Sequence, residues 1–131
     1  MSENTNGRQE AMVYLAGGMK SDWQDRVIAA CPHLAFRDPR THGLTDETEY
    51  TEWDLRGIRD SQIVLAYMDA GNPSGFGLSL EVGYARALGR TIFYVNEDAP
   101  ERQRRFGMVR ACADQVFDSL DAAIEALREH S

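Results

Sequence analysis

Five short apolar runs constrain the fold of this 131-residue chain more than any other feature of the sequence. The runs are largely continuous rather than alternating, which is typical of strands buried on both faces of a parallel sheet. We therefore expect five strands, at residues 11–16, 34–36, 62–68, 91–95 and 115–117.

Helical patterns fill the intervals between these runs. In the first interval, Ser21 and Asp22 can cap a helix that carries Trp23 and Val27 at helical spacing and ends before Pro32. Comparable patterns follow at residues 45–58, 78–88, 101–111 and 119–128. Alternating strands and helices with right-handed crossovers predict an α/β fold. We favour a flavodoxin-like, doubly wound, five-stranded parallel sheet in the order 2-1-3-4-5, with helices on both faces.

The length of the chain fits a single domain, which we expect to span residues 11–131. Residues 1–10 contain no apolar stretch, and we interpret them as a disordered leader rather than a signal peptide. No window is apolar enough for a membrane helix. The two cysteines, Cys31 and Cys112, are far apart and outside any paired spacing, which favours a reducing, cytoplasmic location.

A net charge of −7 argues against binding to a nucleic-acid polymer, because a polyanion requires clustered basic residues. The three histidines, His33, His42 and His130, are scattered, so we predict no metal site. One basic run stands apart from this pattern. It is either a solvated helix face or a contact to a substrate phosphate or another subunit, and it consists of Arg102, Arg104, Arg105 and Arg110.

The predicted topology also places a ligand site. In such a sheet, ligands bind beyond the carboxyl ends of the strands, near the point where the strand order reverses. The turn after the first strand and the loop after the third strand converge there with the helix that follows. We therefore expect substrate contacts from Gly17, Gly18, Asp69, Asn72, Ser74 and Gly77. Asp69 could alternatively serve only to start its turn.

Glu81 is the strongest candidate for a reacting group. It falls in the first turn or so of its predicted helix and has apolar neighbours, an unusual setting for a carboxylate. Helix N–H groups would keep it ionised, and an ionised carboxylate in a semi-apolar cleft can attack an electrophilic carbon. A purely structural role as an exposed acid complementing the helix dipole remains open. Gly75, Gly77 and Gly83 leave room for a planar ligand or serve turn and helix packing.

Two further side chains could act with Glu81. Asp54 lies four residues before Ile58 on one helical face, so it could protonate a leaving group or remain a solvated helix acid. Tyr14 lies in the first strand, where its hydroxyl could orient a carboxylate or be buried in the core.

Three motifs give the chain a resemblance to a known family. They are Tyr14-Leu-Ala-Gly-Gly18, the stretch from Asp54-Leu-Arg-Gly-Ile58 through Ile63-Val-Leu-Ala66, and Gly77-Leu-Ser-Leu-Glu-Val-Gly-Tyr-Ala85. Across about residues 12–118 the chain resembles the nucleoside 2-deoxyribosyltransferases. The resemblance implies a flavodoxin-like fold, no cofactor, and transfer of a 2-deoxyribosyl group between nucleobases through a covalent glycosyl–enzyme intermediate.

The resemblance also implies roles for single residues. Glu81 is similar to the family's nucleophile, Tyr14 to the tyrosine that orients it, and Asp54 to the aspartate that assists protonation of the base. The implied partners are a nucleoside or nucleotide and a nucleobase. The implied assembly is a homo-oligomer, which an apolar face of Trp53, Phe106 and Met108 would also support.

The chain departs from the family at Gly75, where the deoxyribosyltransferases commonly carry a base-contacting aspartate. Asp69, Asn72 or Ser74 could take its place. A related branch of 2′-deoxynucleoside 5′-phosphate N-hydrolases uses the same glutamate chemistry, so hydrolysis of an N-glycosidic bond is an alternative to transfer. A non-catalytic nucleotide-binding or signalling module on the same sheet is the alternative of another class.

Overall fold

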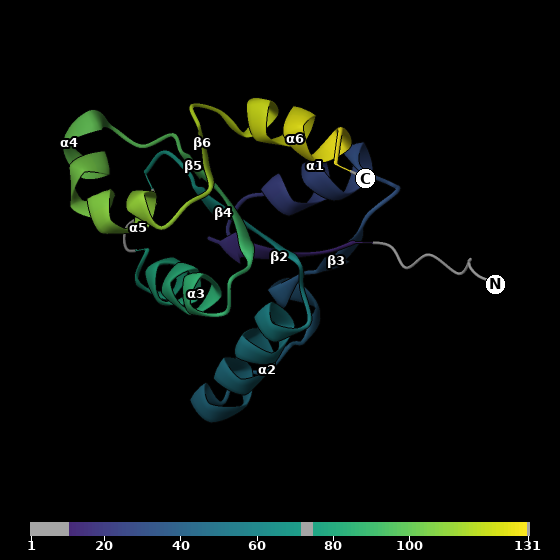
Figure 1. The fold of residues 1–131 in the computed structure, drawn as a ribbon. Coiled ribbons are helices and arrows are strands. Elements are labelled where there is room, and N and C mark those ends of the chain that lie inside the picture. Colours follow the sequence, from purple (N-terminus) through teal and green to yellow (C-terminus); the bar gives the residue numbers. More distant parts are fainter. Residues whose placement is uncertain (1–10, 72–74, 131) are drawn as a thin grey trace.

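The expected apolar runs form one parallel sheet (Figure 1). The computed structural model describes residues 11–71 and 75–130. The strands are β2 (Met12–Gly17), β3 (Ala35–Arg37), β4 (Ile63–Met68), β5 (Thr91–Asn96) and β6 (Gln115–Phe117). Their order is β3-β2-β4-β5-β6, and each neighbouring pair is parallel. Since β2 is the first of these strands along the chain, the predicted order 2-1-3-4-5 is confirmed.

Some expectations lie outside the described residues. They are the leader at residues 1–10 and the substrate contacts at Asn72 and Ser74.

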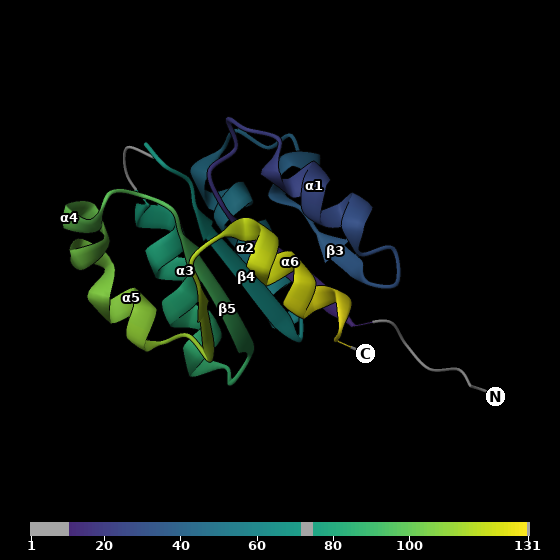
Figure 2. The same cartoon turned by 90° about the horizontal axis from the view of Figure 1, so that it is seen from above.

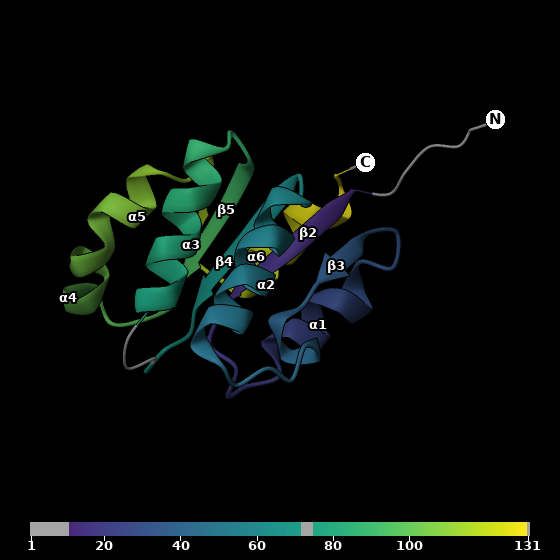
Figure 3. The same ribbon diagram turned by 90° about the horizontal axis from the view of Figure 1, so that it is seen from below.

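Helices cover both faces of the sheet, as predicted. One face is covered by α1 (Trp23–Ala30) and α6 (Leu120–Arg128), which lie in front of the strands in Figure 2. The other face is covered by α2 (Glu47–Arg59), α3 (Phe76–Ala87) and α5 (Gly107–Ala111), which lie in front in Figure 3. These two layers give the doubly wound arrangement.

The alternation of side chains along β4 divides the core into two clusters. All six residues of this central strand are buried. Ile63, Leu65 and Tyr67 pack with α1 and α6, whereas Val64, Ala66 and Met68 pack with α2, α3 and α5. Because successive strand residues point to opposite faces, a continuous apolar run supplies both clusters.

Two helices differ from the prediction. The single helix expected at residues 101–111 is broken into α4 (Pro100–Gln103), the 3-10 turn η2 (Arg104–Phe106) and α5. The break comes at Phe106, whose backbone leaves the helical region (φ −106°, ψ 24°). Helix α3 begins at Phe76, two residues earlier than expected, so Glu81 lies in its second turn rather than its first.

The apolar face expected from Trp53, Phe106 and Met108 is only partly present. Trp53 and Phe106 are partly buried and pack against the core cluster under α2, α3 and α5. Met108 alone among the three is strongly exposed, at 85%. The aromatic side chains of Trp53 and Phe106 remove apolar area from water by packing against the core. The sequence pattern could not distinguish this packing from a role at the surface.

Three further observations concern the described residues. None of their helices is both long and apolar enough to span a bilayer. Residues 11–71 and 75–130 contain no cluster of three or more side chains suited to hold a metal ion. Cys31 is buried, Cys112 is partly buried, and both are free thiols.

Candidate active site

A cavity of about 210 Å³ opens at the carboxyl ends of β2 and β4, where the strand order reverses. Its walls come from the turn after β2, the segment after β3, helix α2 and the start of α3. The lining residues are Gly17, Gly18, Met19, Pro39, Asp54, Gly75, Gly77, Leu78 and Glu81. The cavity therefore lies where the topology places ligands in folds of this type.

Glu81 and Tyr14 are joined by a short hydrogen bond. The Tyr14 hydroxyl donates to Oε2 of Glu81 at 2.6 Å, across 67 residues of sequence. Tyr14 is fully buried in the centre of β2, so its ring cannot swing away from the carboxylate. Because this hydrogen bond is short and its donor is held rigidly, it fixes the direction in which Glu81 faces the cavity.

Helix α2 brings Asp54 to the same place because it approaches β2 closely. The contact is made at Gly57, one turn after Asp54, where an added Cβ would lie 3.0 Å from the ring of Tyr14. A side chain at this position would have to displace either the Tyr14 ring or helix α2. Gly57 therefore sets the distance between α2 and the Tyr14–Glu81 pair, and a sequence pattern alone carries no sign of this role.

Burial shifts the acid–base behaviour of all three groups. Burial raises the pKa of Glu81 from its ordinary value of 4.5 to about 8. The Tyr14 hydrogen bond lowers this pKa, and the neighbouring Asp54 raises it further. Burial also raises the pKa of Asp54, while His42 opposes that rise. The pKa of Tyr14 is raised by burial and by Glu81, so its hydroxyl stays a donor. Two neighbouring carboxyl groups with raised pKa values can hold one proton near neutral pH.

His42 approaches Asp54 from the loop after β3, a contact that was not predicted from the sequence. The Nδ1 atom of His42 accepts the backbone N–H of Leu44 at 2.8 Å. That bond leaves the proton on Nε2, which lies 3.6 Å from Oδ1 of Asp54. The imidazole packs edge-on against Trp53, with ring centroids 4.9 Å apart. His42 therefore presents a polar N–H edge to the carboxyl of Asp54, although no spacing motif connects the two.

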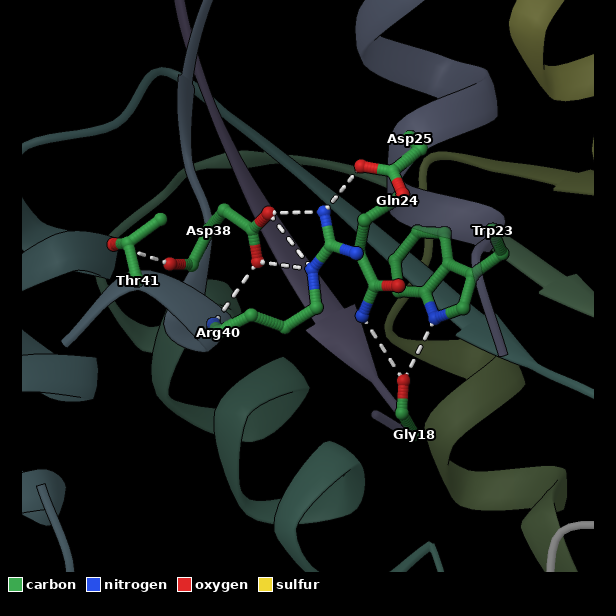
Figure 4. A network of polar contacts seen from close by, with 7 residues as sticks. All are labelled: Gly18, Trp23, Gln24, Asp25, Asp38, Arg40 and Thr41. Carbon is green, nitrogen blue, oxygen red and sulfur yellow. Dashed lines mark hydrogen bonds and ion pairs between the residues drawn. The ribbon is translucent and has the colours of Figure 1, made fainter. Parts of the chain in front are cut away.

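A polar network holds two walls of the cavity in place (Figure 4). The carbonyl oxygen of Gly18 accepts hydrogen bonds from Trp23 Nε1 at 2.8 Å and Gln24 Nε2 at 3.0 Å, which fixes the turn after β2. Arg40 binds the buried carboxylate of Asp38 and the exposed carboxylate of Asp25. These bonds anchor the 3-10 turn η1 (Pro39–Thr41), whose first residue lines the cavity.

The same network affects the charge of the cavity. Arg40 is engaged by two carboxylates, and the described lining contains Asp54 and Glu81 but no lysine or arginine. The cavity is therefore acidic, a setting that stabilises a developing positive charge.

The predicted substrate contacts are only partly brought together. Gly17, Gly18 and Gly77 line the cavity. Asp69 is not among the described lining residues, and its Oδ2 atom accepts a hydrogen bond from Ser21 Oγ at 2.9 Å. Its other oxygen, Oδ1, is buried and has no hydrogen-bond partner among residues 11–71 and 75–130.

Gly75 forms the N-terminal cap of α3 in a backbone conformation that favours glycine. Its φ is +80°, in the left-handed region. A Cβ there would lie 2.6 Å from the methyl carbon of Met68 and 3.0 Å from the ring of Phe106. An acidic side chain at this position would therefore have to displace the Met68 methyl group and the Phe106 ring and hold a left-handed backbone.

Fold and site together define a flavodoxin-like α/β protein with a partly buried pair of carboxyl groups at the switch point of its sheet. Within that class the comparison with known families is specific. The sequence model of the family described as "Nucleoside 2-deoxyribosyltransferase like" matches residues 10–99, more than half of the chain. The chain belongs to the nucleoside 2-deoxyribosyltransferase-like family. None of the curated proteins matches it.

Several solved structures share the fold. A 2-desoxiribosyltransferase from Leishmania mexicana superposes with a TM-score of 0.73 at 21% identity, covering 92% of this chain and 98% of that one. A 2-deoxyribosyltransferase from Bacillus psychrosaccharolyticus gives 0.69 at 16% identity, covering 92% and 93%. The CMP N-glycosidase BcmB from Clostridium botulinum gives 0.63 at 18% identity, covering 91% and 99%. At these identities the likeness supports the fold.

Proposed function

We propose that this protein cleaves the N-glycosidic bond of a deoxynucleoside and transfers the sugar to another nucleobase, with Glu81 as the nucleophile. The observation that carries the proposal is the 2.6 Å hydrogen bond from the buried Tyr14 hydroxyl to Glu81, at the wall of a cavity that Asp54 also lines. An oriented carboxylate beside a second carboxyl group is the arrangement that glycosyl transfer with a covalent intermediate requires.

In the first step, Glu81 attacks C1′ of the sugar as its bond to the base nitrogen breaks. The electron pair of that bond leaves with the base, and Asp54 supplies the proton that neutralises it. Tyr14 holds the attacking oxygen in line, and the acidic lining stabilises the oxocarbenium-like transition state. The products are a glycosyl ester on Glu81 and a free base.

In the second step, a nitrogen of the acceptor base attacks the same carbon and displaces Glu81. Asp54, now ionised, takes the proton from the incoming base. Two displacements at one carbon restore the original configuration, as in retaining glycosidases. Membership of the family supports this sequence of steps for a nucleoside-type substrate.

The remaining predicted contacts fit the same proposal. The backbone at Gly17, Gly18 and Gly77 borders the cavity and leaves space for a sugar or a flat base. The buried, unpartnered oxygen of Asp69 is an acceptor for a substrate N–H or O–H that reaches past the cavity. Asn72, like Ser74, would contribute from the segment outside the described residues.

Hydrolysis is the second candidate, since water can replace the acceptor base in the second step. One of the solved structures that share the fold is a CMP N-glycosidase, and this likeness supports hydrolysis as the second candidate. Transfer requires that the bound acceptor keeps water from the glycosyl ester, whereas hydrolysis requires that water reaches it.

One experiment distinguishes these activities. The protein is incubated with a panel of deoxynucleosides and deoxynucleoside 5′-phosphates, with and without an acceptor base, and the released bases are separated by chromatography. We expect base exchange that depends on the acceptor. Base release without an acceptor would instead identify a hydrolase. Measurable binding without turnover would refute the enzymatic proposal and identify a nucleotide-binding module.

Variants of the two carboxyl groups test their roles. Glu81→Ala removes the nucleophile and should abolish both base exchange and base release. Unchanged turnover in this variant would refute the covalent mechanism. Asp54→Asn should slow cleavage more for poor leaving bases than for good ones, because good ones need less help from a proton. Equal slowing across the panel would contradict the acid role.

A further inference from the structure

His42 is held in one orientation from two sides. Its Nδ1 atom accepts the backbone N–H of Leu44 at 2.8 Å, and its ring packs edge-on against Trp53, with centroids 4.9 Å apart. The ring of Trp53 is itself covered by the guanidinium group of Arg37, which lies 5.9 Å from its centre. The His42 side chain is only 9% exposed, so the imidazole has little freedom to turn.

The contact with Leu44 determines which ring nitrogen carries the proton. A backbone N–H can only donate, so the nitrogen that receives it must have a free lone pair. The proton of the neutral ring is therefore on Nε2, the atom that lies 3.6 Å from Oδ1 of Asp54. His42 directs a fixed N–H group, rather than a lone pair, toward this oxygen.

The two oxygens of Asp54 have different surroundings. Oδ1 is buried and makes no hydrogen bond within residues 11–71 and 75–130. The Asp54 side chain is nevertheless 20% exposed and lines the cavity, so its accessible part does not include Oδ1. Oδ2 is the other polar atom of the side chain. The N–H of His42 is therefore directed at the buried oxygen, and Oδ2 is left to serve the cavity.

We propose that His42 is a positioning residue that keeps the acidic proton of Asp54 on Oδ2, the oxygen that serves the cavity. An oxygen that faces an N–H group is the poorer site for a proton, because two hydrogens would then point at each other. The inference rests on the proposed function, in which Asp54 protonates the leaving base. It assigns the proton to the atom that can reach this base.

The same contact stabilises Asp54 after the proton has moved. The O–H bond at Oδ2 breaks, the nitrogen of the base gains the proton, and a negative charge is left on the carboxyl group. The N–H of His42 stabilises this charge and keeps its own proton. The separation of 3.6 Å is longer than a hydrogen bond, and catalytic contacts of this length often tighten when substrate binds.

A role for His42 in folding alone predicts a different hierarchy of contacts. In that role the bond to Leu44 matters most, because it holds the loop after β3. Two substitutions separate the contacts. The amide nitrogen of glutamine lies near the position of Nε2, so His42→Gln keeps an N–H group for Asp54. The amide oxygen of asparagine lies near the position of Nδ1, so His42→Asn keeps an acceptor for Leu44.

The first test compares base release by these two variants over a series of good and poor leaving bases. The kcat of His42→Asn should be at least about tenfold below that of His42→Gln, with similar KM, and the gap should widen for poorer leaving bases. His33→Asn is the matched control, since His33 is exposed and its Nε2 lies 3.1 Å from the carbonyl oxygen of His130. Equal losses in the two His42 variants, or a larger loss in His42→Gln, would overturn the proposal.

The second test needs no turnover, so it separates failure of this inference from failure of the proposed function. Near neutral pH, ¹⁵N NMR of the unaltered protein distinguishes protonated from unprotonated ring nitrogens in the three histidines. His42 should carry its proton on Nε2. Asp54→Asn should shift this Nε2 signal, whereas Glu125→Gln on α6, over the opposite face of the sheet, should not.

The outcomes of the NMR test are distinct. A proton on Nδ1, or an Nε2 signal that does not respond to Asp54→Asn, would refute the positioning role even in an active enzyme. The expected signals in a protein that releases no base would support the contact between His42 and Asp54 and would refute the proposed function alone.

Discussion

Replacing Glu81 by glutamine tests the buried state of this carboxyl group without measuring catalysis. The pKa of Glu81 is raised by burial from 4.5 to about 8. The folded protein therefore holds this proton more tightly than the unfolded chain does. The stability that results is fully present below pH 4.5 and is lost as the pH rises through 8. Between pH 5 and pH 9 the loss amounts to roughly 4 kcal/mol.

Glutamine has nearly the same shape, can still accept the Tyr14 hydrogen bond, and carries no proton to lose in this range. The free energy of unfolding of Glu81→Gln should therefore lack the decrease that the ionisation of Glu81 causes between pH 5 and pH 9. Urea titrations at pH 5 and pH 9 give the difference, and Glu125→Gln serves as control because the Glu125 side chain is 64% exposed. Parallel pH profiles for the unaltered protein and Glu81→Gln would show that Glu81 ionises freely, and would refute the reasoning.

Three other predictions concern the surroundings of this group. Tyr14→Phe removes a hydrogen bond to a carboxylate worth about 1.5–3 kcal/mol, so kcat/KM should fall roughly 10- to 100-fold; an unchanged rate would remove Tyr14 from the mechanism. Gly75→Asp restores the acid common in the family but forces a left-handed backbone, and urea unfolding should show a loss of about 1–3 kcal/mol; a stable, more active variant would contradict this. His42→Phe keeps the packing on Trp53 but removes an influence that lowers the pKa of Asp54, so the alkaline limb of the kcat/KM profile should move to higher pH; an unmoved limb would separate the two residues.

The sheet could be predicted because its determinants are local. The runs that became β2, β4 and β5 are apolar over nearly their whole length, and right-handed crossovers then leave few possible strand orders. The segment at residues 101–111 was harder, because its break depends on the turn of Phe106 toward Gly75, a contact between distant parts of the chain.

The site could be predicted to the level of its elements but not of its contacts. The strand ends predicted that Glu81 and the glycines of the first turn lie at one cavity, whereas Asp54 was a candidate because of its position on a helix face. The pairing of Asp69 with Ser21 could not be foreseen, because a turn residue has no fixed direction until its neighbours are in place. The approach of His42 to Asp54 likewise depends on the path of an irregular loop.

The close packing of α2 at Gly57 also has an evolutionary consequence. Position 57 touches no substrate, yet an added methyl group would have to move either the Tyr14 ring or the whole helix that carries Asp54. Drift at this position therefore changes the spacing between the two carboxyl groups before any reacting residue is altered. One substitution at position 57 would therefore change the activity of a descendant protein even if Tyr14, Asp54 and Glu81 were all retained.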